Sequence, residues 1–206
     1  MKLPLLTAAL VLASSLAQAS VFDFGSLAAG SEANLAATDG VTFSYASLVP
    51  NTNGDGDPIG GSTWQLDPSS GPVLVQDPSL RGHGAGPNSL DAVDQPVAVV
   101  FPYPVTLELF YGYLDRGTLG GAPVPHELVF LADDKHVIYS TELDFGTPGA
   151  FFSVSHLYSV SEVILPSDKY YEMLAYVATP EMDGRVLAGV AALCGGWIIR
   201  RKSVKK

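Results

Sequence analysis

One stretch of the chain has residue types and a spacing that suit metal binding. Residues 51–57 read Asn-Thr-Asn-Gly-Asp-Gly-Asp, which places oxygen-bearing side chains at alternate positions: Asn51, Asn53, Asp55 and Asp57. Calcium loops use such alternating oxygen ligands, with Gly where the chain turns sharply. Position 12 of a complete loop is a bidentate Glu, but here it is Ser62. The alternative is a solvated turn, since Asn, Gly and Asp are ordinary turn residues.

Aromatic side chains are the second feature with chemical meaning. An exposed ring on a β-sheet protein offers a flat surface on which a sugar ring can stack, although most strand aromatics belong to a core. Trp64 lies in a stretch rich in Gly, Pro, Asp and Asn rather than in a long apolar strand. We therefore single out Trp64 as the candidate carbohydrate-binding residue.

Motifs for catalysis are incomplete. The segment His126-Glu127-Leu128-Val129-Phe130 begins like a zinc-protease helix, but Phe130 occupies the position of the second His. The sequence has no Gly-x-Ser-x-Gly elbow and no Gly-x₄-Gly-Lys phosphate loop. A pair of carboxylates for glycoside hydrolysis remains an alternative, because the distance between two carboxylates in space cannot be read from the sequence. We expect a protein that is not an enzyme.

The elements that must position these residues are short strands. Apolar and aromatic runs are separated by Gly, Pro, Asn and Asp, and we predict strands at 21–24, 41–48, 63–66, 73–76, 97–101, 105–114, 127–131, 136–141, 151–155, 161–165 and 170–177. In the longest, a period of two puts Val105, Leu107, Leu109, Tyr111 and Tyr113 on one face. Many short strands predict an all-β sandwich or jelly roll over residues 20–178. Residues 50–88 stand out as a long, irregular connection.

The two ends of the chain predict an exported, membrane-tethered protein. Met1-Lys2, the apolar run 3–16 and Ala17-Gln18-Ala19 predict a signal peptide over residues 1–19. Residues 186–199 are apolar and would form a helix of about 21 Å, short of the ~30 Å hydrocarbon core. The tail 200–206, with Arg200, Arg201 and Lys202, would hold that end in the cytoplasm. The alternative for 186–199 is a buried core helix.

Charge excludes one class of partner. Outside the two ends, residues 20–179 contain four basic and 19 acidic residues, a formal charge of −15. Such a field repels nucleic acid, so we expect no nucleic-acid partner. The only cysteine, Cys194, falls in the apolar tail, and the exported part therefore has no disulfide.

The C-terminal arrangement resembles the PEP-CTERM sorting signal. A short motif (Thr179, Pro180, Glu181 and Met182), the apolar helix 186–199 and the basic end 200–206 follow one another in the family's order. Met182 stands where the family has a second Pro. The resemblance implies an exosortase-like enzyme as a partner, transient anchoring in the inner membrane through residues 179–206, and later sorting to the cell surface or extracellular matrix.

The body is also similar to those upstream of other PEP-CTERM tails. The similarity lies in 21–27, 40–44, 86–92, 96–97 and 101–105. It implies a jelly-roll, galactose-binding-like fold whose first and last strands adjoin and can share Ca²⁺. Asp23 and Glu172 are then a second candidate calcium pair, against the alternative of two surface carboxylates. The resemblance implies a structural or adhesive role in an exopolysaccharide or biofilm, with carbohydrate binding; a secreted glycan hydrolase and a ligand-free surface-layer component are the alternatives.

Overall fold

The computed structural model describes residues 17–53, 58–77, 88–92, 94–116, 127–143, 151–167 and 169–180. Ala17–Thr179 form one compact unit. Most of the predicted signal peptide, and everything from Glu181 onward, lies outside the described residues, so the signal and the tail stay predictions. Within the described ranges, no helix combines the length and the hydropathy that crossing a bilayer requires.

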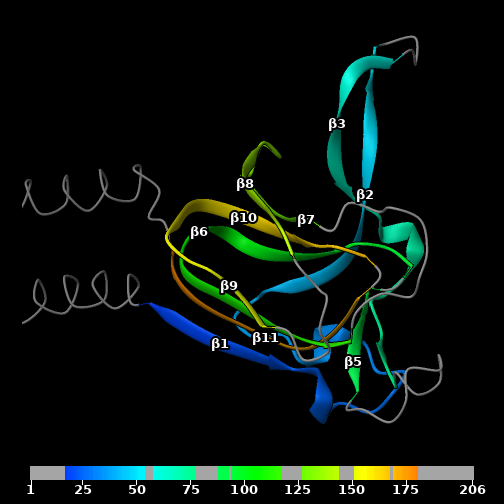
Figure 1. Ribbon diagram of the computed structural model, residues 1–206, viewed down its shortest axis with the longest axis vertical. Coiled ribbons are helices and arrows are strands. Elements are labelled where there is room, and N and C mark those ends of the chain that lie inside the picture. Colours follow the sequence, from blue (N-terminus) through cyan, green and yellow to red (C-terminus); the bar gives the residue numbers. More distant parts are fainter. Residues whose placement is uncertain are drawn as a thin grey trace, which may run out of the picture. The chain divides into compact units, whose positions relative to one another are not determined.

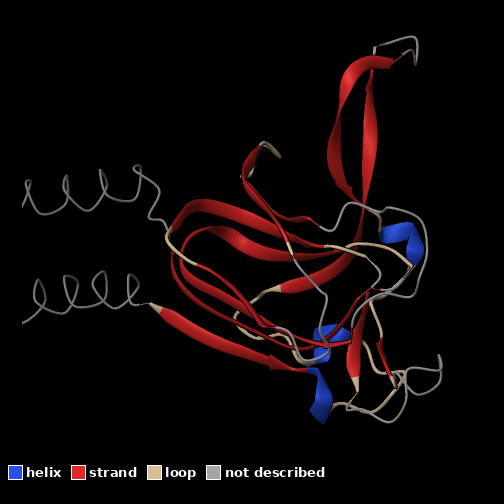
Figure 2. Cartoon of the chain, in the orientation of Figure 1, coloured by secondary structure: helices blue, strands red, loops and turns tan. Residues whose placement is uncertain are grey.

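The described chain is all-β, as predicted (Figures 1 and 2). Its strands are β1 (Gln18–Asp23), β2 (Thr42–Thr52), β3 (Pro58–Leu66), β4 (Val75–Gln76), β5 (Ser89–Ala92), β6 (Val97–Arg116), β7 (Glu127–Leu131), β8 (Val137–Glu142), β9 (Phe151–Val154), β10 (Leu157–Leu165) and β11 (Lys169–Pro180). Three 3₁₀ turns join them: η1 (Phe24–Ser26), η2 (Ala33–Leu35) and η3 (Pro68–Ser70).

The 20-residue strand β6 belongs to both layers of the sandwich. Its first part pairs with β2 and β10, and layer A is completed by β3, β7 and β8. Its last part pairs with β9, and β6 also adjoins β11, which carries β1 and β5; these strands and β4 make layer B. Figure 1 shows β7 and β8 above β6, and β1 and β11 below it.

Aromatic rings from the two layers meet in the core. Phe22 of β1 packs edge-on against Phe43 of β2, with centroids 5.2 Å apart. Phe110, in the last part of β6, packs edge-on against Phe130 of β7 at 5.8 Å. Neither pair joins hydrogen-bonded strands, so the contacts bridge facing sheets, as the inner faces of a sandwich require.

Two prolines explain why β6 can change layers. Val100 pairs with Glu162, and Val105 pairs with Val160. The four residues Phe101-Pro102-Tyr103-Pro104 therefore stand against the single residue Ser161. Proline has no N–H to donate, so the ladder is interrupted there and the strand can bend. The sequence predicted two strands, 97–101 and 105–114, where the chain has one.

The predicted alternation of the longest strand is correct only as far as Leu107. Val105 and Leu107 are buried, but Glu108 and Leu109 are both exposed, and the buried positions resume at Phe110 and Gly112. Leu109, Tyr111 and Tyr113 therefore face outward, contrary to the prediction. A Cβ on Gly112 would lie 2.2 Å from Cζ of Phe152, so the Phe152 ring occupies the space a side chain would need.

The stretch 50–88 is more regular than predicted. β2 continues to Thr52 and forms a hairpin with β3, in which Thr52 pairs with Pro58 and Leu48 with Trp64. β5, which the sequence did not predict, is buried at every position. Its alternation of apolar and polar residues is too short to distinguish from a loop.

Candidate functional site

The predicted calcium loop contains the connection between β2 and β3. Asn51 is engaged across this hairpin: its Oδ1 accepts a hydrogen bond from Thr63 Oγ1 at 2.6 Å, and its Nδ2 donates to the Gly60 carbonyl at 3.5 Å. Asp55 and Asp57 lie outside the described residues. Among the residues that are described, no three His, Cys, Asp or Glu side chains gather closely enough to hold a metal. Calcium binding at 51–57 stays a prediction.

The second calcium pair lies on adjacent strands. β1 and β11, the first and last strands, pair side by side, as the resemblance implied. Asp23 stands opposite Met173 rather than opposite Glu172. Two carboxylates at neighbouring positions supply fewer ligands than Ca²⁺ takes, so this site also stays a prediction.

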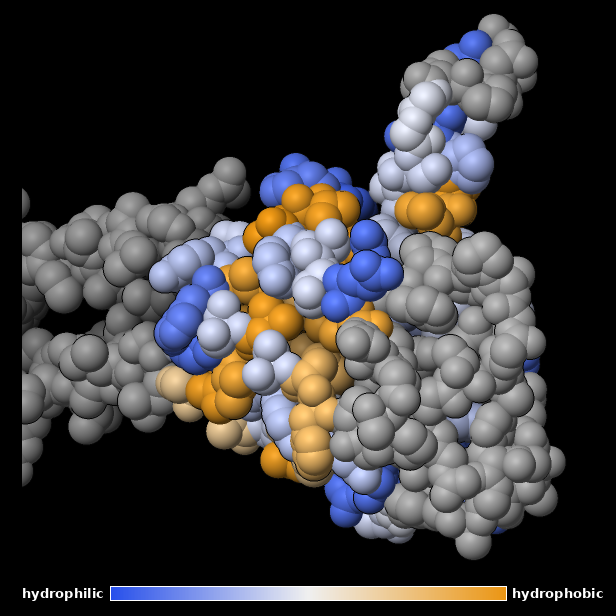
Figure 3. All heavy atoms as spheres, viewed as in Figure 1, coloured by the Kyte–Doolittle hydropathy of each residue, from blue (hydrophilic) through white to orange (hydrophobic). Residues whose placement is uncertain are grey.

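Trp64 anchors the β2–β3 hairpin. The ring is partly buried against an outer cluster on layer A, made of Ala46, Ala98, Val129, Leu131 and Ile164. Leu48 and Leu66, which lie on the same face of the hairpin, are 48% and 38% exposed. Figure 3 shows the hairpin polar toward its tip and apolar at its base. Part of the Trp64 surface therefore serves packing, and the prediction that it binds sugar is untested.

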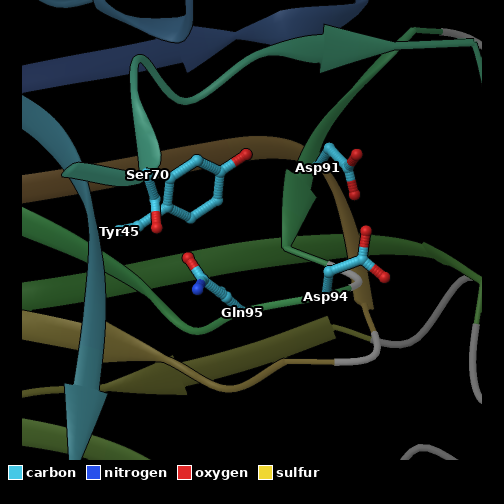
Figure 4. Close-up of a pocket in the computed structure, with 5 residues that line it drawn as sticks. All are labelled: Tyr45, Ser70, Asp91, Asp94 and Gln95. Atoms are coloured by element: carbon cyan, nitrogen blue, oxygen red, sulfur yellow. The ribbon is translucent and has the colours of Figure 1, made fainter. Parts of the chain in front are cut away.

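A pocket of about 270 Å³ lies where four segments of the chain converge. Its lining residues are Tyr45 of β2, Ser70 of η3, Asp91 of β5, and Asp94 and Gln95 of the bend before β6 (Figure 4). Asp91 is only 5% exposed, whereas Asp94 is exposed. In Figure 4 the two carboxylates lie on one side of the pocket, while Ser70 and Gln95 approach the Tyr45 ring.

Hydrogen bonds hold the lining residues in place. The Asp67 amide donates to the Tyr45 carbonyl at 2.7 Å, which fixes η3 beside β2. Ser70 Oγ donates to Asp67 Oδ2 at 2.8 Å, and Ser69 donates to Oδ1, so these hydroxyls lower the pKa of the Asp67 carboxyl. The Asp91 amide donates to the Leu74 carbonyl at 3.0 Å.

The lining chemistry suits a ligand rich in hydroxyl groups. Asp91 and Asp94 supply carboxylate acceptors, Gln95 supplies a donor and an acceptor, and Tyr45 and Ser70 supply hydroxyls. None of the five lining residues is basic, and two acids would repel an anion. A neutral polyol can instead donate to the carboxylates and accept from the amide.

Sequence reasoning missed this pocket. Tyr45, Ser70 and the segment 91–95 are brought together only by pairing between distant strands. The only signal was that 86–92, 96–97 and 101–105 resemble other PEP-CTERM bodies, and this resemblance named no ligand. Of the sorting motif, Thr179 and Pro180 end β11, and Glu181, Met182, Arg200, Arg201 and Lys202 lie outside the described residues.

Comparison with known proteins gives distant structural likenesses. No family model matches the sequence, and no curated protein matches it. A fucose-binding module of Streptococcus pneumoniae has 8% identity and a TM-score of 0.28, over 47% of this chain and 72% of that one. CBM32-1 from a family 31 glycoside hydrolase of Clostridium perfringens has 12% identity and a TM-score of 0.32, over 69% of this chain and 95% of that one. At these scores the likeness assigns neither a ligand nor an activity.

Proposed function

We propose that this chain is an exported, non-catalytic surface protein that binds neutral extracellular polysaccharide through the pocket at Tyr45, Asp91 and Asp94. Its body is a jelly roll of galactose-binding-like type. Residues 1–19 direct export, and residues 179–206 anchor the body in the inner membrane until an exosortase-like enzyme releases it. Its role in an exopolysaccharide matrix is structural or adhesive.

The observation that carries the proposal is the composition of the pocket. Small-ligand sites are concave and use a few converging polar groups to fix the ligand. Here five polar residues from four segments converge, and one carboxylate, that of Asp91, is almost fully buried. A carboxylate has several acceptor sites, and sugar hydroxyls are suitable donors to it.

The position of the pocket in the fold supports a role at a surface. Asp91 pairs with Tyr170 near the start of β11, whereas Ala178, near its end, pairs with Gln18. At ~3.3 Å per residue, the strand between Tyr170 and Ala178 spans about 26 Å. The pocket and the C-terminal tether therefore lie at opposite ends of β11, so that attachment leaves the pocket accessible to matrix polymers.

The proposal is tested by co-sedimentation of purified residues 20–179 with the host's extracellular polysaccharide, in Ca²⁺ and in EDTA. We expect saturable binding that 0.5 M salt does not abolish, because a neutral ligand forms no ion pair. Binding lost in EDTA would add calcium to the site and direct attention to Asp55 and Asp23. No binding in either buffer would contradict the proposal and favour a ligand-free surface component.

A glycan hydrolase is the second candidate, because the pocket brings two carboxylates together. Glycosidases use such a pair as acid and as base or nucleophile. Release of reducing ends from the bound polysaccharide distinguishes the two functions. We expect none; release that disappears in Asp94→Asn would make the protein an enzyme.

A further inference from the structure

The outer face of layer B is apolar. Cross-strand pairs put Val21 with Ala175 and Tyr113 with Phe151 on the side of the sheet opposite the core. We use the name apolar face for the apolar outward residues of β1, β11, β6 and β9: Val21, Leu109, Tyr111, Tyr113, Phe151, Met173, Ala175 and Val177. Asp23 and Ser153 face the same side, opposite Met173 and Tyr111. Their neighbours along each strand, such as Phe22, Gly112 and Leu174, are buried, and Gly112 faces Leu174 in the core. The two sides of this sheet are therefore clearly separated.

This face exposes large side chains. Phe151 is 64% exposed, Val21 58% and Leu109 38%. Tyr111 stacks on Phe151 with centroids 5.6 Å apart, and Tyr113 lies 4.6 Å from the same ring. The aromatic side chains thus hold one another in place at the surface without being covered by the described chain.

The composition of the face is that of an interface core. Tyr, Phe and Met are enriched in such cores and charged residues are depleted. The large side chains gather around Phe151, and the carboxylate of Asp23 on the same side lies on the edge strand β1. Asp23, opposite Met173, and Glu108, paired with His156 at 3.3 Å, lie next to it along β1 and β6. These charges lie at the margin of the face rather than beside Phe151, and a contiguous exposed apolar patch marks an interaction site.

The chain beyond the described residues indicates what covers it. β1 and β11, which supply half of the face, are the strands that connect to the apolar runs 3–16 and 186–199. Gln18 and Ala178 are paired, so both connections leave the body at one end. A tether of a few residues after Pro180 raises the concentration of this face near a bilayer without any new contact. Tyr side chains suit the boundary between lipid and water.

We propose that the apolar face rests on the lipid surface while residues 186–199 anchor the chain. The proposal rests on the tether in the proposed function, but not on the pocket. The body charge of −15 opposes binding to anionic lipid. The surface that fits is therefore zwitterionic headgroups, with Phe151, Tyr113 and Val21 inserted at the acyl boundary.

The experiment uses the full chain with Cys194→Ser, reconstituted at one copy per phosphatidylcholine nanodisc. A polarity-sensitive dye is placed at Val21→Cys on the face or, as a matched control, at Val137→Cys on β8. The two valines are similarly exposed, at 58% and 53%. We expect a blue shift of the emission at position 21 and none at position 137. Phe151→Ser should lower the docked fraction about tenfold, because it removes most of the apolar area of one exposed ring.

Each other outcome overturns the proposal in a distinguishable way. If the chain co-elutes with nanodiscs but the emission does not shift at position 21, the apolar face does not contact lipid, although the tether is retained. Equal shifts at positions 21 and 137 lead to the same conclusion. A shift that requires two copies per disc makes a second copy of the chain the occupant. A chain that does not enter nanodiscs removes the tether as well, while polysaccharide co-sedimentation reports separately on the pocket. If Phe151→Ser unfolds the chain, Tyr113→Ser takes its place.

Discussion

Asp91 of β5 stands directly opposite Tyr170 of β11, and this pair joins the pocket to the last strand of the sandwich. The other end of β11 pairs with the first strand, Ala178 with Gln18. A single strand therefore connects the candidate binding pocket with the point at which both chain ends leave the body. This arrangement lets one end of the body serve attachment while the other serves binding.

Two buried serines should respond in opposite ways to substitution. Ser161 faces the bend of β6, and its hydroxyl has no hydrogen-bond partner within the described part of the chain. Ser20 Oγ donates to Asp39 at 2.6 Å and accepts from Thr38 at 3.0 Å. We expect Ser161→Ala to be neutral or stabilising by up to ~1 kcal/mol, and Ser20→Ala to cost ~1–2 kcal/mol. Urea unfolding measures the free energy of unfolding of both variants. Equal losses would contradict the claim that only the Ser20 hydroxyl is hydrogen-bonded.

Gly112→Ala should destabilise the sandwich by overpacking. The added methyl would overlap the Phe152 ring at 2.2 Å and approach Leu174 at 3.0 Å. We expect a loss of ~1–3 kcal/mol in the free energy of unfolding. The double variant Gly112→Ala/Phe152→Leu should be more stable than the sum of the two single losses predicts, because the smaller Leu side chain leaves room for the added methyl group. Strict additivity in this cycle would show that the two residues do not compete for space.

The stability of the body should fall above about pH 10 because of Tyr171. Burial raises the pKa of its phenol well above the ordinary value of 10.0, and its hydroxyl donates to the Pro166 carbonyl at 3.0 Å. Above pH 10 the unfolded chain loses this proton while the folded chain retains it, so stability is complete below that pH and declines as pH rises.

Tyr171→Phe isolates this effect. It should cost ~1 kcal/mol at neutral pH through the lost hydrogen bond, and should reduce the alkaline slope by up to ~1.4 kcal/mol per pH unit. Some slope should remain, because burial also raises the pKa of Tyr176. Unfolding curves from pH 8 to 11 test this, and parallel profiles for the two proteins would refute it.

Lys135 and Glu162 form an ion pair that should contribute to the stability of the fold, because the Glu162 carboxylate is buried. Glu162 is 5% exposed on layer A, between Val100 of β6 and Leu131 of β7, and Lys135 reaches it from the β7–β8 turn. Lys135→Met leaves this carboxylate without its cation and should cost ~2–3 kcal/mol, whereas Lys135→Met/Glu162→Met should be close to wild type. A Lys135→Met protein as stable as the parent would show that water replaces the lysine.

The strands of the body could be predicted from the sequence because they obey local rules. Glu127–Leu131 forms a strand with the predicted bounds, and the turn at Asp133-Asp134 joins β7 to β8 as a hairpin. The face of β6 beyond Leu107 was predicted wrongly. The side chains of β6 change sides at Glu108-Leu109, where two consecutive residues are exposed, and no local feature of the sequence marks this point.

The candidate site was less predictable because it depends on distant pairing. Asp91 and Asp94 are separated by only two residues, but Tyr45 joins them only because β2 and β6 are neighbours in layer A. The aromatic residues illustrate the same point. Trp64 packs on the outer cluster, while Tyr111 and Tyr113 face outward because the alternation of β6 shifts at Glu108-Leu109.

The central claim, that the pocket binds a neutral saccharide, is tested most directly by comparing Asp94→Asn with Asp133→Asn. Both aspartates are exposed, but only Asp94 lines the pocket, and Asp133 lies in the β7–β8 turn. Calorimetric titration of residues 20–179 with oligosaccharides from the host polysaccharide measures the affinity of each variant. We expect Asp94→Asn to weaken binding at least tenfold, about 1.4 kcal/mol, and Asp133→Asn to bind like the parent. Equal affinities for all three proteins would contradict the claim.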